Sequence, residues 1–195
     1  EKQWLDSKDK IFIASKWAKD FADYAIQFVD EQKDDRPFFL YLAFNAPHWP
    51  LHAKEKDIQK FTKIYRKKGW DEIREARRKR MAKMGIIDLN TDFAEWENRK
   101  WDELTEQEKD QVAYRMAVYA AQVHCVDYNI GKLIDCLKKN HKMDNTLILF
   151  MSDNGACAEP YEELGGGKVE EVNNPASSFA PTYGRAWAQV SNTPF

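Results

Sequence analysis

The sequence predicts an α/β domain in which helices flank a mostly parallel sheet. Two continuous apolar runs, residues 38–44 and 146–151, have the length of strands that are buried on both faces. The stretches around them show helical periodicity or high charge instead. The resulting order of helix, strand, helices, long helix and strand is typical of helices layered on a parallel sheet.

The composition excludes several classes of protein. The 195 residues are 13% aromatic and 32% charged, with a net charge of −2. This aromatic content is too high for a disordered chain, and the charge balance gives no field that draws the chain to nucleic acid. No apolar run approaches the ~18–20 residues that span a bilayer, so we expect neither a membrane span nor a nucleic-acid partner. Three scattered cysteines are too few for a disulfide framework or a zinc cage.

Helices are expected on both sides of the first apolar run. Residues 54–104 are strongly charged and helical in pattern, and Gly69 and Gly85 divide them. Between Ile11 and Val29, apolar residues recur every three or four positions, as on one face of an amphipathic helix. They are Ala14, Trp17, Phe21, Ala25 and Phe28.

A long helix is expected before the second apolar run. Thr105 and Glu108 form a capping-box pattern, which predicts where this helix starts. An apolar stripe then continues to Leu137, beyond ordinary helix length, so we expect a bend near residues 129–131. The chain from Ala156 onward is rich in Gly, Pro and Asn and is predicted to be a long loop.

Polar motifs follow both predicted strands. His48 comes after the first, held between Pro47 and Pro50, and Asp153 and Asn154 come after the second. Because the carboxyl ends of parallel strands share one rim of a sheet, we expect the His48 and Asp153 side chains within ~10 Å of each other. Carboxylate and amide oxygens suit a hard cation such as Ca²⁺, and an imidazole can serve as acid or base. Each motif alone also fits an ordinary turn or a surface histidine.

The motifs taken together resemble the type I sulfatases, and bacterial arylsulfatases in particular. Residues 37–51, which contain Pro-Phe-Phe-Leu-Tyr-Leu-Ala and Ala-Pro-His-Trp-Pro-Leu, carry the first part of the resemblance. Residues 144–155, ending in Ser-Asp-Asn-Gly, carry the second. Residues 184–195, with Gly-Arg-Ala-Trp and Ser-Asn-Thr-Pro-Phe, carry the third. The likeness extends from about Asp20 to the last residue.

The resemblance implies an alkaline-phosphatase-like fold and hydrolysis of sulfate esters. In that family a formylglycine hydrate attacks sulfur while a calcium ion polarises the sulfate oxygens. Asp153 and Asn154 match the family's second pair of calcium ligands, and His48 matches the histidine near the leaving oxygen. The implied partners are a small sulfate ester or a sulfated carbohydrate, and the implied location is periplasmic or secreted.

The formylglycine precursor is missing from this sequence. Its motif is Cys-x-Pro/Ala/Ser-x-Arg, and none of Cys125, Cys136 and Cys157 is followed by such residues. The chain begins at Glu1 and stops at Phe195 without a closing element, so we expect residues 1–195 to be a middle-to-late portion of a sulfatase catalytic domain, with 54–104 as a charged helical insertion. The isolated chain is expected to be inactive and to bind Ca²⁺ weakly or not at all.

Two other interpretations remain open. A phosphodiesterase or phosphatase of the same superfamily would hold two zinc ions through Asp and His residues, but no paired Asp-His motif follows Asp153. A non-catalytic helical module could instead bind polyanions, because residues 63–83 contain ten Lys or Arg and only three acids. Charge runs on helices are more often solvated faces, and aromatic residues are few in this stretch.

Overall fold

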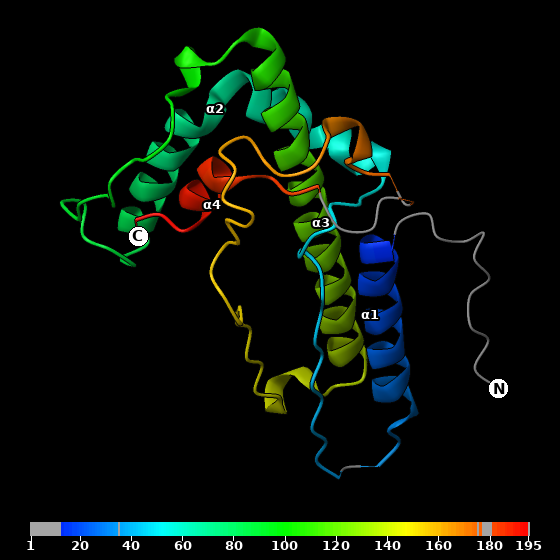
Figure 1. Cartoon of the computed structure of the whole chain (residues 1–195). Coiled ribbons are helices and arrows are strands. Elements are labelled where there is room, and N and C mark those ends of the chain that lie inside the picture. The colour runs from blue at the N-terminus through cyan, green and yellow to red at the C-terminus, as the bar shows by residue number, and fades with distance from the viewer. Residues whose placement is uncertain (1–12, 35, 175, 177–180, 195) are drawn as a thin grey trace.

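The computed structural model describes residues 13–34, 36–174, 176 and 181–194. Over these residues the chain forms the helices α1 (Ile13–Glu31), α2 (Glu55–Lys83), α3 (Glu106–Lys139) and α4 (Arg185–Ser191), together with the short 3-10 helices η2 (Trp101–Glu103), η3 (Met143–Asn145) and η4 (Val169–Glu171) (Figure 1). No helix in these ranges is long and apolar enough to cross a membrane.

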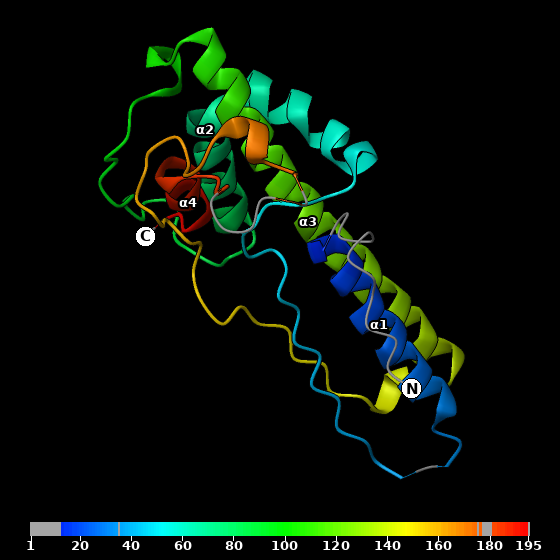
Figure 2. The same cartoon turned by 45° about the vertical axis from the view of Figure 1, so that its right-hand side comes forward.

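The long helix α3 is the axis of the structure. Helix α1 packs along one end of α3, while α2 packs at the other end and carries α4 (Figures 1 and 2). The α1 contact includes an ion pair between Lys132 Nζ and Asp23 Oδ1 at 2.6 Å. The two ends of α3 therefore support two different layers of helix.

Helix α2 is divided at Gly69, as the sequence predicted. Gly69 has φ 65° and ψ 178°, outside helical geometry. A Cβ at this position would lie 2.3 Å from the Trp101 ring, so the close approach of that ring also requires glycine. Gly85, with φ 72°, follows the end of the helix. Residues on both sides of the break, Ile58 and Trp70, are fully buried.

Helix α3 begins at the predicted capping box. The Glu108 backbone N–H donates to Thr105 Oγ1 at 3.2 Å, and the Thr105 N–H donates to Glu108 Oε2 at 2.8 Å. Helix α3 continues without a break through residues 129–131, near which a bend was expected, and ends at Lys139. Gly131 faces open space, so nothing there forces the helix to change direction.

The core lies where α2, α3 and α4 meet. Trp70, Trp101 and Trp187 pack edge to face or tilted, with ring centroids 5.2–6.2 Å apart. Trp187 Nε1 donates to the Val112 carbonyl at 3.0 Å, so the indole polar group is satisfied inside the core. The long loop predicted from Ala156 onward is therefore wrong at Arg185–Ser191, where α4 forms and carries Trp187. The Gly-, Pro- and Asn-rich residues that suggested a loop lie before and after this short helix.

The two predicted strands form no β-ladder among the described residues, so the parallel sheet is not confirmed. Residues 37–46 and 146–152 run as extended chain in the same direction, toward the end of the molecule where α4 lies (Figures 1 and 2). The physical reason is that a strand needs neighbouring strands for its backbone groups, and neither segment has one within the described residues. Phe39 and Leu147 are consequently 88% and 85% exposed.

One of these segments nevertheless keeps the alternation of a strand. Phe38 packs with the cluster around Val29 and Leu137, and Phe44 packs with the cluster around Val126. The odd-numbered residues between them are exposed. Segment 37–46 therefore lies on the α1–α3 layer by one face and leaves the other face bare, as a strand on a helical layer does.

Candidate functional site

His48 is exposed in the turn that follows the first extended segment. Its Nδ1 lies 2.8 Å from the Trp49 carbonyl oxygen. A carbonyl can only accept, so Nδ1 carries a proton and the neutral ring has its lone pair on Nε2. The imidazole also stacks at a tilt on the Trp49 ring, with centroids 4.8 Å apart. These contacts hold the ring so that Nε2 is the atom that can exchange a proton.

Asp153 and Asn154 lie in the turn that follows the second extended segment. Both are exposed, and Ser152 Oγ donates to the Asn154 carbonyl at 2.6 Å, which closes the turn on itself. Beyond the turn, Ala156 is hydrogen-bonded to Asn192 at the end of α4. The side chains of Asp153 and Asn154 are thus offered outward from a turn whose far end is fixed.

The two turns stand at corresponding ends of two segments that run in the same direction (Figure 2). That both turns belong to one rim of a sheet, with the His48 and Asp153 side chains within ~10 Å of each other, stays a prediction.

Asp153 and Asn154 offer the type of ligand atom that calcium prefers, but they provide fewer ligands than calcium needs. Asp153 offers a carboxylate and Asn154 an amide oxygen, which are ligands that hard cations prefer. In the described part of the chain, no group of three or more His, Cys, Asp or Glu side chains gathers in a way that could hold a metal ion. Since calcium takes about six to eight oxygens, most of its ligands would have to come from outside these two residues.

His52 has a structural role that sequence reasoning did not see. It is 1% exposed, and its Nε2 donates to the Asn174 carbonyl at 2.8 Å. Asn173 pairs with the same stretch, donating its N–H to the Leu51 carbonyl and accepting from Ala53 N–H through Oδ1. Burial lowers the pKa of His52. Loop 169–174 is therefore hydrogen-bonded to residues 51–53, which directly follow the turn that carries His48.

Arg115 was also missed, because it interrupts the apolar stripe of α3. It is 4% exposed and donates to the carbonyls of Gly166 (2.7 Å), Thr182 (2.8 Å) and Gly167 (2.5 Å). Burial lowers its pKa, and the three carbonyls compensate for the lost water. Arg115 thereby ties the glycine loop and the approach to α4 onto α3. The sequence signal that could have revealed this role is an arginine at a position of α3 that faces the core.

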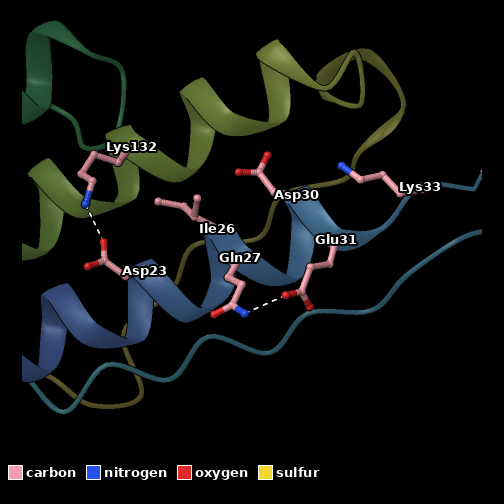
Figure 3. Close-up of a pocket in the computed structure, with 7 residues that line it drawn as sticks. All are labelled: Asp23, Ile26, Gln27, Asp30, Glu31, Lys33 and Lys132. Atoms are coloured by element: carbon pink, nitrogen blue, oxygen red, sulfur yellow. Dashed lines mark hydrogen bonds and ion pairs between the residues drawn. The ribbon is translucent and has the colours of Figure 1, made fainter.

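A shallow groove of about 500 Å³ lies between α1 and α3 (Figure 3). Three acidic residues, Asp23, Asp30 and Glu31, are among those that line it. Asp23 pairs with Lys132 and Lys19, Glu31 accepts from Gln27, and Asp30 accepts from Asn140 at 2.7 Å. These hydrogen bonds lower the pKa values of Asp23 and Asp30. Because the carboxylates are engaged with side chains of the two helices, the groove is a structural seam between them.

No disulfide joins Cys125, Cys136 or Cys157 in the structure. Burial raises the pKa values of Cys125 and Cys136, and the Asp30 carboxylate adds to the effect at Cys136. A raised pKa keeps a thiol protonated and unreactive near neutral pH. Both cysteines lie in apolar clusters of the α1–α3 layer, and the Cys136 thiol also donates to Asp30 Oδ1 at 3.4 Å.

Comparisons with known proteins identify the family. The sulfatase family profile matches residues 2–191. An uncharacterized sulfatase of Schizosaccharomyces pombe is 36% identical over 189 residues, which are 89% of this chain and 33% of that protein. An arylsulfatase of Klebsiella aerogenes is 35% identical over 170 residues, covering 83% of this chain and 36% of that protein. The uncharacterized sulfatase YdeN of Escherichia coli is 31% identical over 164 residues, or 83% of this chain and 21% of that protein.

The chain therefore belongs to the sulfatase family, and the resemblance carried by its motifs is confirmed. It spans about a third of the length of the first two relatives.

Proposed function

We propose that this chain is the middle-to-late part of a sulfuric ester hydrolase in which His48 protonates the leaving oxygen and Asp153 and Asn154 bind calcium. The observation that supports it best is the fixed imidazole of His48. Its Nδ1 is bound to the Trp49 carbonyl, so the opposite nitrogen is left for proton transfer. Membership of the sulfatase family supplies the reaction class.

Each residue has a separate part in the proposed reaction. A bound calcium ion supplies Lewis-acid polarisation of the sulfate oxygens. Asp153 contributes one negative charge to that site and Asn154 a neutral oxygen. The attacking group is a formylglycine hydrate from another part of the parent polypeptide, since none of the three cysteines has the required motif. As the ester S–O bond breaks, the imidazolium form of His48 gives its Nε2 proton to the departing oxygen and returns to the neutral ring that is protonated on Nδ1.

A parallel sheet in the parent polypeptide is part of the same proposal. In the parent polypeptide, segments 37–46 and 146–152 pair with further strands in a mostly parallel, alkaline-phosphatase-like sheet, with the α1–α3 layer covering one face. The bare face of segment 37–46 and the exposure of residues 147–151 support this. Residues 54–104 are proposed as a charged helical insertion, although Trp70 within them is part of the aromatic core.

The proposed substrates are small sulfate esters or sulfated carbohydrates, and the proposed location is periplasmic or secreted. Neither competing interpretation gains support. The paired Asp-His motif that would favour a two-zinc phosphatase is not found after Asp153 in this sequence. Part of the basic run on α2 is engaged within the chain, since Arg66 pairs with Glu106 and Asp110, and Arg74 stacks on Phe93.

Sulfate release by the parent polypeptide tests the proposal. His48→Ala should lower turnover of 4-nitrophenyl sulfate by roughly 10²-fold or more, the usual effect of losing a positioned acid. The loss should grow as the leaving group becomes more basic, because such groups depend more on protonation. His124→Ala, on α3, is the matched control and should change turnover little. An equal loss across leaving groups would leave His48 with a binding role only.

Calcium binding by this chain alone gives a second test. Asp153 and Asn154 provide only part of a coordination sphere, so we expect a dissociation constant on the order of millimolar or weaker. Isothermal titration calorimetry measures it, with Asp153→Ala as the control. Micromolar one-to-one binding that Asp153→Ala abolishes would show a complete local site and contradict a site divided between this chain and the rest of the parent.

A further inference from the structure

We infer that Asn192, the residue that follows α4, is a positioning residue for the Asp153–Asn154 turn and thereby sets the metal affinity of the site. The inference rests on the proposed function of that turn. Asn192 does not itself supply a ligand. It acts by holding the backbone immediately after the two proposed ligands.

The contact is a reciprocal pair of hydrogen bonds. The Ala156 N–H donates to Asn192 Oδ1 at 2.7 Å, and Asn192 Nδ2 donates to the Ala156 carbonyl at 3.1 Å. One side-chain amide thus pairs with both polar groups of one residue, as a neighbouring backbone would. Two bonds to one residue fix its orientation as well as its distance.

Gly155 shows how closely the turn is fitted to this amide. A Cβ at Gly155 would lie 2.8 Å from Asn192 Oδ1, which is nearer than real Cβ atoms approach. A side chain at this position would therefore push the turn away from Asn192.

A second contact holds the next residue along the chain. The Tyr183 hydroxyl is hydrogen-bonded to the backbone of Cys157. Tyr183 is buried, and its ring packs on Tyr119 of α3 with centroids 4.6 Å apart. The two residues that follow the turn are consequently both held. Ala156 is bound by Asn192, which follows α4, and Cys157 is bound by Tyr183, which precedes α4.

Helix α4 can hold the turn because α4 is itself fixed. Its Trp187 is fully buried and bonded to the Val112 carbonyl of α3. The segment before α4 is bound to Arg115 through the Thr182 carbonyl. A rigid connection therefore runs from the core of α3 through α4 to the residue that follows Asp153 and Asn154.

This connection has a consequence for metal binding. Calcium is bound by several oxygens at 2.3–2.6 Å, so affinity depends on how well the ligands are held before the ion arrives. Without the Asn192 bonds, the turn would have to be ordered at the moment of binding, and that cost would appear as weaker affinity.

Hydrogen exchange tests the contact without any activity. Asn192→Ala should speed exchange of the Ala156 amide by about 10-fold, the change expected when ordinary hydrogen bonds are lost. Asn140→Ala is the matched control, because Asn140 is the corresponding residue at the end of α3 and its Nδ2 bonds to the Cys136 carbonyl. It should leave exchange at Ala156 unchanged. Equal exchange in Asn192→Ala and the wild type would overturn the inference.

Calcium dependence of the parent polypeptide distinguishes positioning from simple stability. Asn192→Ala should raise the calcium concentration for half-maximal sulfate release by about 10-fold, while saturating calcium restores the rate. Asn140→Ala should lower the melting temperature without this shift. A rate that excess calcium does not restore would assign Asn192 a structural role only. If the wild type neither binds calcium nor releases sulfate, the proposed function fails together with the metal role, but the exchange result still reports the contact.

A double mutant provides the sharpest check. Gly155→Ala alone should weaken calcium binding as Asn192→Ala does, because its methyl group meets Asn192 Oδ1. In the Asn192→Ala background that obstacle is gone, so adding Gly155→Ala should have little further effect. Losses that multiply independently would contradict direct coupling between the two positions.

Discussion

Trp70 and Trp187 are fully buried between α2, α3 and α4, whereas Phe39 and Phe150, which stand in the two most apolar runs of the sequence, are 88% and 80% exposed. The two regions carry the same kind of side chain. They differ in where the covering surface comes from. The tryptophans are covered by helices of this chain, and the phenylalanines have no comparable cover among the described residues.

The contrast separates local from non-local structure. A helix satisfies its backbone hydrogen bonds within itself, so α2 and α3 need only each other's apolar faces. A strand needs neighbours for its backbone as well as cover for its side chains. Large exposed apolar surface generally marks an interaction site, and here it coincides with the segments that most need partners.

Removing a core tryptophan should have the largest effect on stability. Trp187→Ala would lose the ring contacts to Trp70, Trp101 and Tyr65 and the hydrogen bond from Nε1 to the Val112 carbonyl. We expect a loss of about 3–5 kcal/mol in the free energy of unfolding, which could leave the chain largely unfolded. Chemical denaturation followed by circular dichroism measures it. A loss below about 1 kcal/mol would show that this cluster is not the core.

The contact between His52 and loop 169–174 should make stability depend on pH. Its folded-state pKa lies below the ordinary value of 6.5, because charging the ring would add a proton to a buried Nδ1 that has no partner. The unfolded chain therefore binds the extra proton more readily. Stability should be complete above about pH 6.5 and fall as the pH decreases, by up to ~1.4 kcal/mol per pH unit.

Denaturation at pH 7 and pH 5 measures this dependence. His52→Gln should flatten it, since glutamine does not titrate, whereas His124→Gln on α3 should preserve it. A wild-type chain equally stable at both pH values would show that the buried ring costs nothing to charge.

The elements that could be predicted from sequence are those whose determinants are local. Thr105 and Glu108 meet within one turn, so their capping box located the start of α3 correctly. Gly69 likewise marked the break in α2. The reason for that break, the Trp101 ring, is 32 positions away and carries no signal at Gly69 itself.

In the candidate site, too, residues in local motifs could be predicted from the sequence, and residues that depend on distant partners could not. His48, Asp153 and Asn154 could be proposed because each stands in a short motif after an apolar run. Asn192 could not, since its partner Ala156 is 36 residues away and only the folded position of α4 brings them together. The extended segments were assigned as strands from their own apolar character, but a sheet also depends on neighbours that these residues do not specify.

The smallest effect is expected on the exposed faces of the extended segments. Tyr41 and Leu149 are 81% and 72% exposed, so Tyr41→Ser or Leu149→Ser should change the unfolding free energy of this chain by less than about 0.5 kcal/mol. Phe44→Ala is the matched control, because Phe44 packs against the Val126 cluster and should cost more. In the parent polypeptide Leu149→Ser should instead cost about 2–5 kcal/mol, as expected for a leucine buried in a sheet. A negligible cost there as well would mean that segment 146–152 stays uncovered, and the proposed sheet would have to be abandoned.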